Sequence, residues 1–271
     1  MRQVLLHLGL HKTGTTAAQS FLFENRELIW PRHALVLPYR TRKAGLSEAA
    51  TRYSVYGTPG ALADFTDLTW EFLASLEFGK RRGLILSEEN FAGLRPSRNI
   101  AVGYEAAPEL AVRLVELIQE RLRNEPLDIT VYLSLRQRGS WLRSLWAHDL
   151  RRTRLVQDFD TYRTRLDPVP SPHTAAEQIR ARLPDIKVQT EWLEYLHHRE
   201  FGPGAPFAEF LDLPPEKHAQ LVGPSNINHA LPEDVLAKLL DLNRSALDET
   251  ALIAEKAAVV ERAQTDLIGT P

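Results

Sequence analysis

The sequence predicts a single α/β domain over residues 1–271, with a mainly parallel sheet and helices on both of its faces. Two observations predict this fold class. Apolar runs of strand length alternate along the chain with longer segments in which apolar residues recur at helical spacing. The connections between successive strands are also long enough for the crossovers that parallel strands require.

Bulk composition indicates a globular protein with one substantial core. Of the 271 residues, 44% are hydrophobic and 25% are charged, and the formal net charge of −2 argues against general nucleic-acid binding. Cysteine is absent, which excludes disulfides and thiol nucleophiles, and the nine histidines show no metal-binding spacing, so we expect no metal site. The apolar N-terminal run is too short to span a membrane and no cleavage site follows it. We therefore expect a cytoplasmic protein with no integral membrane segment.

The first expected elements are a strand over residues 4–8 and a helix that begins at residues 15–16 and continues to Trp30. A short strand over 34–37 follows. Residues 39–60 then mix basic residues, tyrosines and small residues, and predict a long, partly irregular excursion. This excursion is a candidate acceptor-binding segment or lid, and a solvated surface loop is an equal alternative.

From residue 61 onward the expected helices and strands alternate. A helix over 61–80 leads to a strand over 83–87, which runs directly into two glutamates. A helix from Pro108 leads to a strand over 129–135, whose near-continuous apolar sequence is typical of a strand buried on both faces. The later expected elements are helices over 174–183 and 206–213, a strand over 186–190, and an amphipathic C-terminal helix from 231 or 232 that packs on the core or covers a dimer partner.

The segment between the first strand and the first helix has the composition of an anion-binding loop. Gly9 and Gly14 permit backbone angles that other residues disfavour. A strand-loop-helix turn of this kind directs several main-chain N–H groups and the positive end of a helix dipole at one point. Lys12 adds a mobile cation, and the two threonine hydroxyls at the helix start add donors. The alternative is an ordinary corner with an exposed lysine.

The order Gly-Leu-His-Lys-Thr-Gly-Thr-Thr differs from the Walker A pattern G-x-x-x-x-G-K-[ST], because Lys12 precedes the second glycine. It resembles instead the 5′-phosphosulfate-binding loop of sulfotransferases that use 3′-phosphoadenosine-5′-phosphosulfate (PAPS), in which P-K-[ST]-G-T-T is common. His11 stands in place of the usual proline, as is expected in some bacterial members. The resemblance implies the P-loop NTPase-like sulfotransferase fold. It also implies a set of cofactor-binding residues: Lys12, Thr13, Gly14, Thr15 and Thr16.

A second pair of residues resembles the family signature that binds the 3′-phosphate of the cofactor. Arg136 directly follows the strand over 129–135, and Ser144 follows it by eight residues, within a Trp-Leu-Arg-Ser sequence that is similar to bacterial members. Arginine offers a planar fork of donors to a phosphate, and serine adds a hydroxyl. The alternative is an amphipathic helix whose arginine lies on the solvent-exposed face and binds no phosphate. Further along, Asn226 and Asn228 loosely resemble a family loop that approaches the nucleotide.

The resemblance implies an enzyme that moves a sulfuryl group from PAPS to a hydroxyl or amine of a small-molecule or glycan acceptor, and that releases adenosine 3′,5′-bisphosphate. Lys12 is the expected stabiliser of the charge that develops on the leaving group. Glu89 is the expected general base, because it follows a core strand in a Ser-x-Glu sequence like that of bacterial members. His11 and His148 are competing candidates for the base, and both glutamates could also be simple exposed acids.

Two other function classes remain open at this point. A P-loop kinase or NTPase that uses ATP and Mg²⁺ would need the G-K-[ST] order and a strand-terminal acid, which Glu88 could supply. The second class is a non-catalytic nucleotide- or carbohydrate-binding protein of the same fold.

Overall fold

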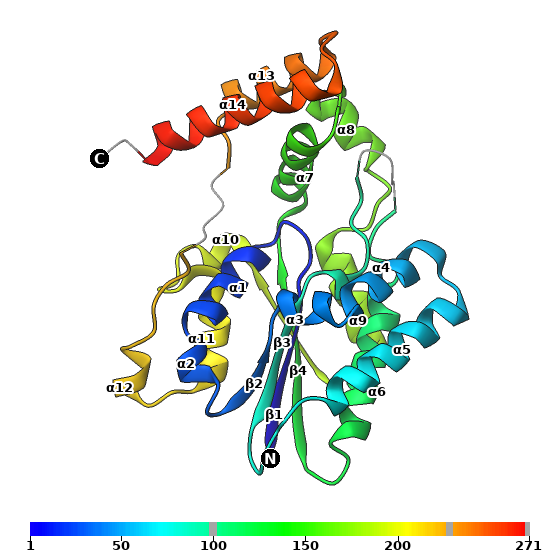
Figure 1. Ribbon diagram of the computed structural model, residues 1–271, viewed down its shortest axis with the longest axis vertical. Helices are drawn as coiled ribbons and strands as arrows, with labels where there is room; N and C mark the ends of the chain where they lie inside the picture. Colours follow the sequence, from blue (N-terminus) through cyan, green and yellow to red (C-terminus); the bar gives the residue numbers. More distant parts are fainter. Residues whose placement is uncertain (98–101, 226–229, 269–271) are drawn as a thin grey trace. The chain divides into compact units, whose positions relative to one another are not determined.

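The computed structural model describes residues 1–97, 102–225 and 230–268. Its central feature is a sheet of five parallel strands in the order β2-β3-β1-β4-β5 (Figure 1). The expected α/β class with a parallel sheet is confirmed, and each expected strand is present. The strands are β1 (Arg2–Leu8), β2 (His33–Val36), β3 (Gly83–Glu88), β4 (Leu127–Leu135) and β5 (Lys187–Trp192).

The chain divides into two compact units. Of the described residues, unit 1 contains 1–95, 102–137 and 170–225, and unit 2 contains 96–97, 138–169 and 230–268. The whole sheet belongs to unit 1. The expectation of one domain over the full chain stays a prediction.

Helices cover both faces of the sheet in unit 1 (Figure 1). One face carries α1 (Thr15–Glu24), α2 (Arg26–Ile29) and α11 (Ala205–Leu211), and the other carries α5 (Pro59–Ala74), α6 (Ala107–Arg121) and α9 (Pro172–Arg182). The shorter elements of this unit are η1 (Asn90–Ala92), α10 (Leu193–Leu196), η2 (Gly202–Gly204) and α12 (Pro215–His218).

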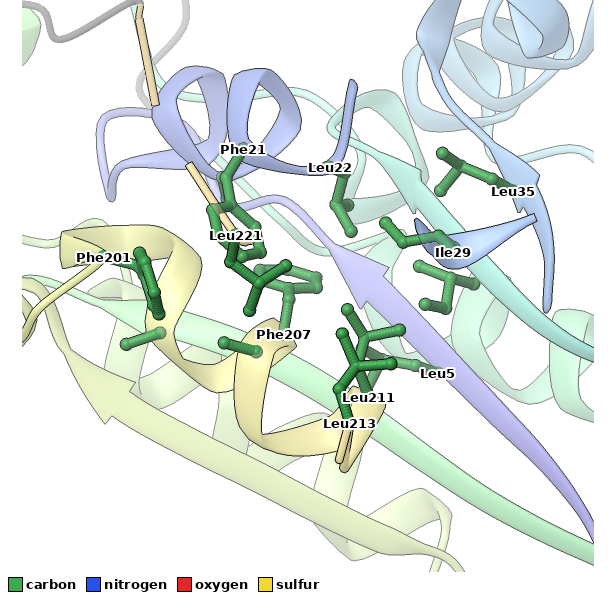
Figure 2. Close-up of a cluster of buried hydrophobic side chains, with 14 of the residues drawn as sticks. Leu5, Phe21, Leu22, Ile29, Leu35, Phe201, Phe207, Leu211, Leu213 and Leu221 are labelled. Atoms are coloured by element: carbon green, nitrogen blue, oxygen red, sulfur yellow. The ribbon is translucent and has the colours of Figure 1, made fainter. Parts of the chain in front are cut away.

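A buried apolar cluster holds the first of these helix layers on the sheet (Figure 2). Phe21 of α1 and Phe207 of α11 meet Leu5 of the central strand in this cluster, and all three are at most 3% exposed. Burial of one such side chain contributes about 1.5–3 kcal/mol. The cluster therefore fixes α1, and with it the loop that precedes α1, on the centre of the sheet.

Residues 39–60, expected to be partly irregular, are mostly helical: they contain most of α3 (Pro38–Lys43), all of α4 (Leu46–Tyr56) and the first two residues of α5. The expectation of irregular structure was wrong because small residues of α4, Ala49 and Ala50, are fully buried. Gly45 joins the two helices with a φ of 76°, which a glycine adopts easily. A role of this segment in acceptor binding stays a prediction.

Two expected helices are each divided in the structure. The helix expected over residues 15–30 breaks between α1 and α2 at Asn25, whose side-chain amide donates to the carbonyl oxygens of Phe21 (2.8 Å) and Val222 (2.9 Å). The expected C-terminal helix is two helices, α13 (Glu233–Arg244) and α14 (Glu249–Ile268).

Unit 2 consists of helices that buried polar contacts join. These helices are α7 (Arg138–Arg152), α8 (Phe159–Arg165), α13 and α14. Lys256 of α14 is only 6% exposed, and its ammonium donates to the side chain of Asn243 in α13 and to the carbonyl oxygen of Thr153, at 3.0 Å each. Among the described residues of both units, no helix combines the length and the apolar character that crossing a membrane would require.

Candidate functional site

The strand order creates a ligand-binding position at the carboxyl edge of the sheet. Strands β1 and β4 are neighbours, but the chain leaves β1 toward β2 on one side and leaves β4 toward β5 on the other. Open α/β sheets bind ligands in the crevice where connections diverge in this way. The loop over residues 9–16 follows β1, and Arg136 follows β4, so both predicted anion-binding segments lie at this position.

The backbone of the 9–16 loop is tightly turned. Lys12 and Gly14 both have left-handed conformations, with φ of 66° and 97°. A Cβ added to Gly14 would lie 2.7 Å from the side chain of Leu193, and one added to Gly9 would lie 2.4 Å from that of Thr15. Both glycines are therefore required by close approach. The loop ends at Thr15, where α1 begins and where the first N–H groups of the helix lack intrahelical acceptors.

Two of the threonines use their hydroxyls inside the loop. The hydroxyls of Thr13 and Thr15 both donate to the carbonyl oxygen of Leu10, at 2.6 and 3.1 Å, and both side chains are buried. The Thr15 hydroxyl, expected to donate to a ligand, thus donates to the main chain of the loop instead. The side chain of Thr16, by contrast, is exposed.

Arg136 joins the two predicted segments directly. Its Nη1 donates to the main-chain oxygen of Lys12 at 3.0 Å. Burial lowers the pKa of Arg136 and nearby Glu194 opposes that shift, so the guanidinium keeps its charge at neutral pH. Glu194 also accepts a hydrogen bond from the main-chain N–H of Gln137 (3.1 Å). The contact with Lys12 therefore orients the arginine at the end of β4, and Glu194 stabilises its charge.

Ser144 and His148, the other residues expected near the second signature, lie half-buried on α7 in unit 2. The pairing of Ser144 with Arg136 and the role of His148 as a competing base stay predictions. Asn226 and Asn228 lie outside the described residues. Within the described part of the chain, no three His, Cys, Asp or Glu side chains gather in a group that could hold a metal ion.

The adjacent glutamates at the end of β3 have different roles. Glu88 is completely buried, and its Oε2 accepts hydrogen bonds from Thr41 and Ser47, which belong to α3 and α4. Its Oε1 accepts from the main-chain and side-chain nitrogens of Asn90, at 3.0 and 3.1 Å. Glu88 is therefore a structural carboxylate that ties α3 and α4 to the sheet.

The Glu88→Gln variant is expected to lose about 1–3 kcal/mol of stability, because an amide –NH₂ would face hydrogen-bond donors at a fully buried position. Urea denaturation measures the loss. Glu71→Gln, at an exposed position of α5, is the control and should unfold like the wild type. Equal midpoints for all three proteins would contradict the structural role of Glu88.

Glu89 faces the site rather than the core. Its side chain is 31% exposed, and its Oε1 lies 3.4 Å from Nη2 of Arg42. Burial and the charge of Glu88 raise the pKa of Glu89, while Arg42, Lys12 and Arg95 act against the rise. A carboxylate with a raised pKa is a stronger proton acceptor than an ordinary glutamate.

His11 is a weaker candidate for the base. Burial lowers its pKa to about 3, and the charges of Arg95 and Lys12 act in the same direction. The imidazole is therefore neutral at pH 7, but a group this reluctant to hold a proton is a poor proton acceptor.

Sequence reasoning missed Tyr104. The tyrosine is 1% exposed, and its hydroxyl accepts a hydrogen bond from the main-chain N–H of His11 at 3.1 Å. It lies far from the loop in the sequence, in a connection with no periodicity or motif, so no signal in the sequence marks it.

Unit 1 thus brings three of the predicted residues, Lys12, Arg136 and Glu89, to one edge of the sheet, at the ends of three adjacent strands. Together they offer cations, main-chain N–H groups and a carboxylate to a ligand. Compared with protein-family models and with curated proteins, the chain matches none of them.

Proposed function

We propose that this protein is a PAPS-dependent sulfotransferase with the P-loop-like fold of that family. The contact between Arg136 and the main chain of Lys12 carries the proposal, because it joins the two segments that resemble the family's two phosphate-binding signatures. The donor set also fits the ligand. Lys12 and the N–H groups at the start of α1 suit a 5′-phosphosulfate, and the planar guanidinium of Arg136 suits a 3′-phosphate.

In the proposed reaction an acceptor oxygen or nitrogen forms a bond to sulfur, while the bond from sulfur to the bridging phosphate oxygen breaks. The electron pair of the broken bond stays on that oxygen, and Lys12 stabilises the charge there. The carboxylate of Glu89 receives the acceptor's proton. The remaining contribution of the chain is to hold the two reactants in line.

The kinase or NTPase alternative has less support. It would use Glu88 as the strand-terminal acid that anchors Mg²⁺, but both carboxylate oxygens of Glu88 already accept hydrogen bonds in a fully buried site. The loop also lacks the G-K-[ST] order.

Thermal unfolding with adenosine 3′,5′-bisphosphate and with ATP plus Mg²⁺ tests the proposal, because a ligand that binds the native state raises Tm. We expect the larger rise with the bisphosphate. Transfer of labelled sulfate from PAPS to a panel of hydroxyl and amine acceptors then tests turnover. Binding without turnover would support the non-catalytic alternative, and a larger rise with ATP and Mg²⁺ would support the kinase.

The Arg136→Ala variant is expected to lose its preference for a 3′-phosphate. Wild-type protein should bind adenosine 3′,5′-bisphosphate more tightly than adenosine 5′-monophosphate, and the variant should bind the two almost equally, because the missing guanidinium serves a group that does not react. Titration calorimetry gives both Kd values. Equal losses for the two ligands would mean that Arg136 acts only through its contact with Lys12.

A further inference from the structure

Tyr104 contacts the 9–16 loop from a segment with no predicted functional role. Its hydroxyl accepts the hydrogen bond from the His11 N–H, and the centroids of the two rings lie 6.2 Å apart. The tyrosine is 1% exposed and His11 is half-buried, so the bond is partly shielded from water and its loss has a cost. The contact therefore restrains the loop.

The backbone of Tyr104 is also unusual. Its φ of 67° is left-handed, which a residue with a bulky side chain adopts only where its surroundings hold it there. Its N–H donates to the carbonyl oxygen of Leu94 (2.8 Å), and its own carbonyl oxygen accepts from the N–H of Ala107 (3.0 Å). These bonds fix the tyrosine between the end of one segment and the start of α6. The hydroxyl thus has a fixed position from which to hold the loop.

We propose that Tyr104 is a positioning residue that holds the 9–16 loop in a single shape. Lys12, the residue after His11, is itself left-handed with a φ of 66°, so the hydrogen bond ties the left-handed Tyr104 to the residue directly before the left-handed Lys12. With the N–H of His11 directed at Tyr104, the loop turns at Lys12 toward the start of α1. The inference rests on the proposed function only for the identity of the anion, a 5′-phosphosulfate.

Hydrogen exchange of the loop amides in ligand-free protein tests the positioning role directly. Tyr104→Phe keeps the ring and removes the acceptor. Tyr132→Phe is the matched control, because Tyr132 is 2% exposed and its hydroxyl has no hydrogen-bond partner among the described residues. We expect the amides of residues 9–14 to exchange about fivefold faster in Tyr104→Phe, as the loss of one partly buried hydrogen bond predicts, and at the wild-type rate in Tyr132→Phe. An unchanged rate in Tyr104→Phe overturns the inference.

Affinity measurements separate this inference from the proposed function. Tyr104→Phe should weaken adenosine 5′-monophosphate and adenosine 3′,5′-bisphosphate by the same factor, because both carry the 5′-phosphate that the loop binds. If wild-type protein binds neither nucleotide but the exchange result holds, the proposed function fails and the positioning role stands. If wild-type protein binds both and Tyr104→Phe matches it in affinity and exchange, the positioning role fails and the proposed function stands.

Discussion

Lys12→Ala is expected to lower kcat by about 100-fold or more, equivalent to about 2.7 kcal/mol of transition-state stabilisation. The negative charge on the bridging oxygen develops only as the bond to sulfur breaks, so the ammonium acts mainly on the transition state. Cofactor affinity should change much less than kcat. Steady-state kinetics with labelled PAPS, together with the Kd for adenosine 3′,5′-bisphosphate, separates the two effects.

Lys12→Met is the matched variant for this test. Lysine, alanine and methionine all carry a Cβ, so each meets the same strain at a φ of 66°, and methionine also keeps most of the apolar stem. Both variants should therefore lose activity alike, while Lys80→Ala, at an exposed position, should not. A folded Lys12→Ala protein with wild-type kcat would remove the lysine from the mechanism.

Glu89→Gln is expected to bind adenosine 3′,5′-bisphosphate normally while kcat falls by about 100-fold, the middle of the usual range for a general base. The amide has the same shape but accepts no proton. The residual activity should also no longer fall at low pH, because the carboxylate that titrates there is gone. Rate measurements across the acidic and neutral pH range record both effects.

The pH profile has a predicted direction. Glu89 must be ionised to accept a proton, and its pKa is raised by burial and by Glu88, so activity should appear at a higher pH than an ordinary glutamate would give. Arg42 lies 3.4 Å from the carboxylate and acts against that rise. Arg42→Ala should therefore move the acidic limb to still higher pH.

Glu71→Gln serves again as the exposed control and should keep the wild-type profile. If Glu89→Gln turns over normally, the base lies elsewhere, and His148 becomes the stronger of the two histidine candidates because the low pKa of His11 makes it a weak base.

The centre of the sheet could be predicted from the sequence because the inner strands β1, β3 and β4 are mostly buried on both faces. Residues 129–135 are almost continuously apolar, and β4 occupies them as expected. The 9–16 loop was also predictable, since Gly9 and Gly14 are needed at positions where any side chain would collide. Local sequence carries these features because local backbone geometry produces them.

Other features depend on contacts between distant residues. The helices over 39–60 are fixed by Thr41 and Ser47 bonding to Glu88, which is more than 40 residues away in the chain. The difference between Glu88 and Glu89 likewise follows from which side chain points into the core, and two adjacent identical residues give no sign of that. The contact of Tyr104 with the 9–16 loop likewise depends on the fold, which brings its hydroxyl to the N–H of His11.

The central position of β1 has a consequence for how the protein folds. Leu5 pairs with Ile85 of β3 and with Thr130 of β4, so the strand that precedes the loop has both neighbours far along the chain. Closing such long loops makes folding slow, and native pairings of this kind form late. A chain interrupted before β4 would leave one edge of β1 open to other chains. We therefore expect refolding yields to fall steeply with protein concentration, and fragments that end before residue 127 to aggregate.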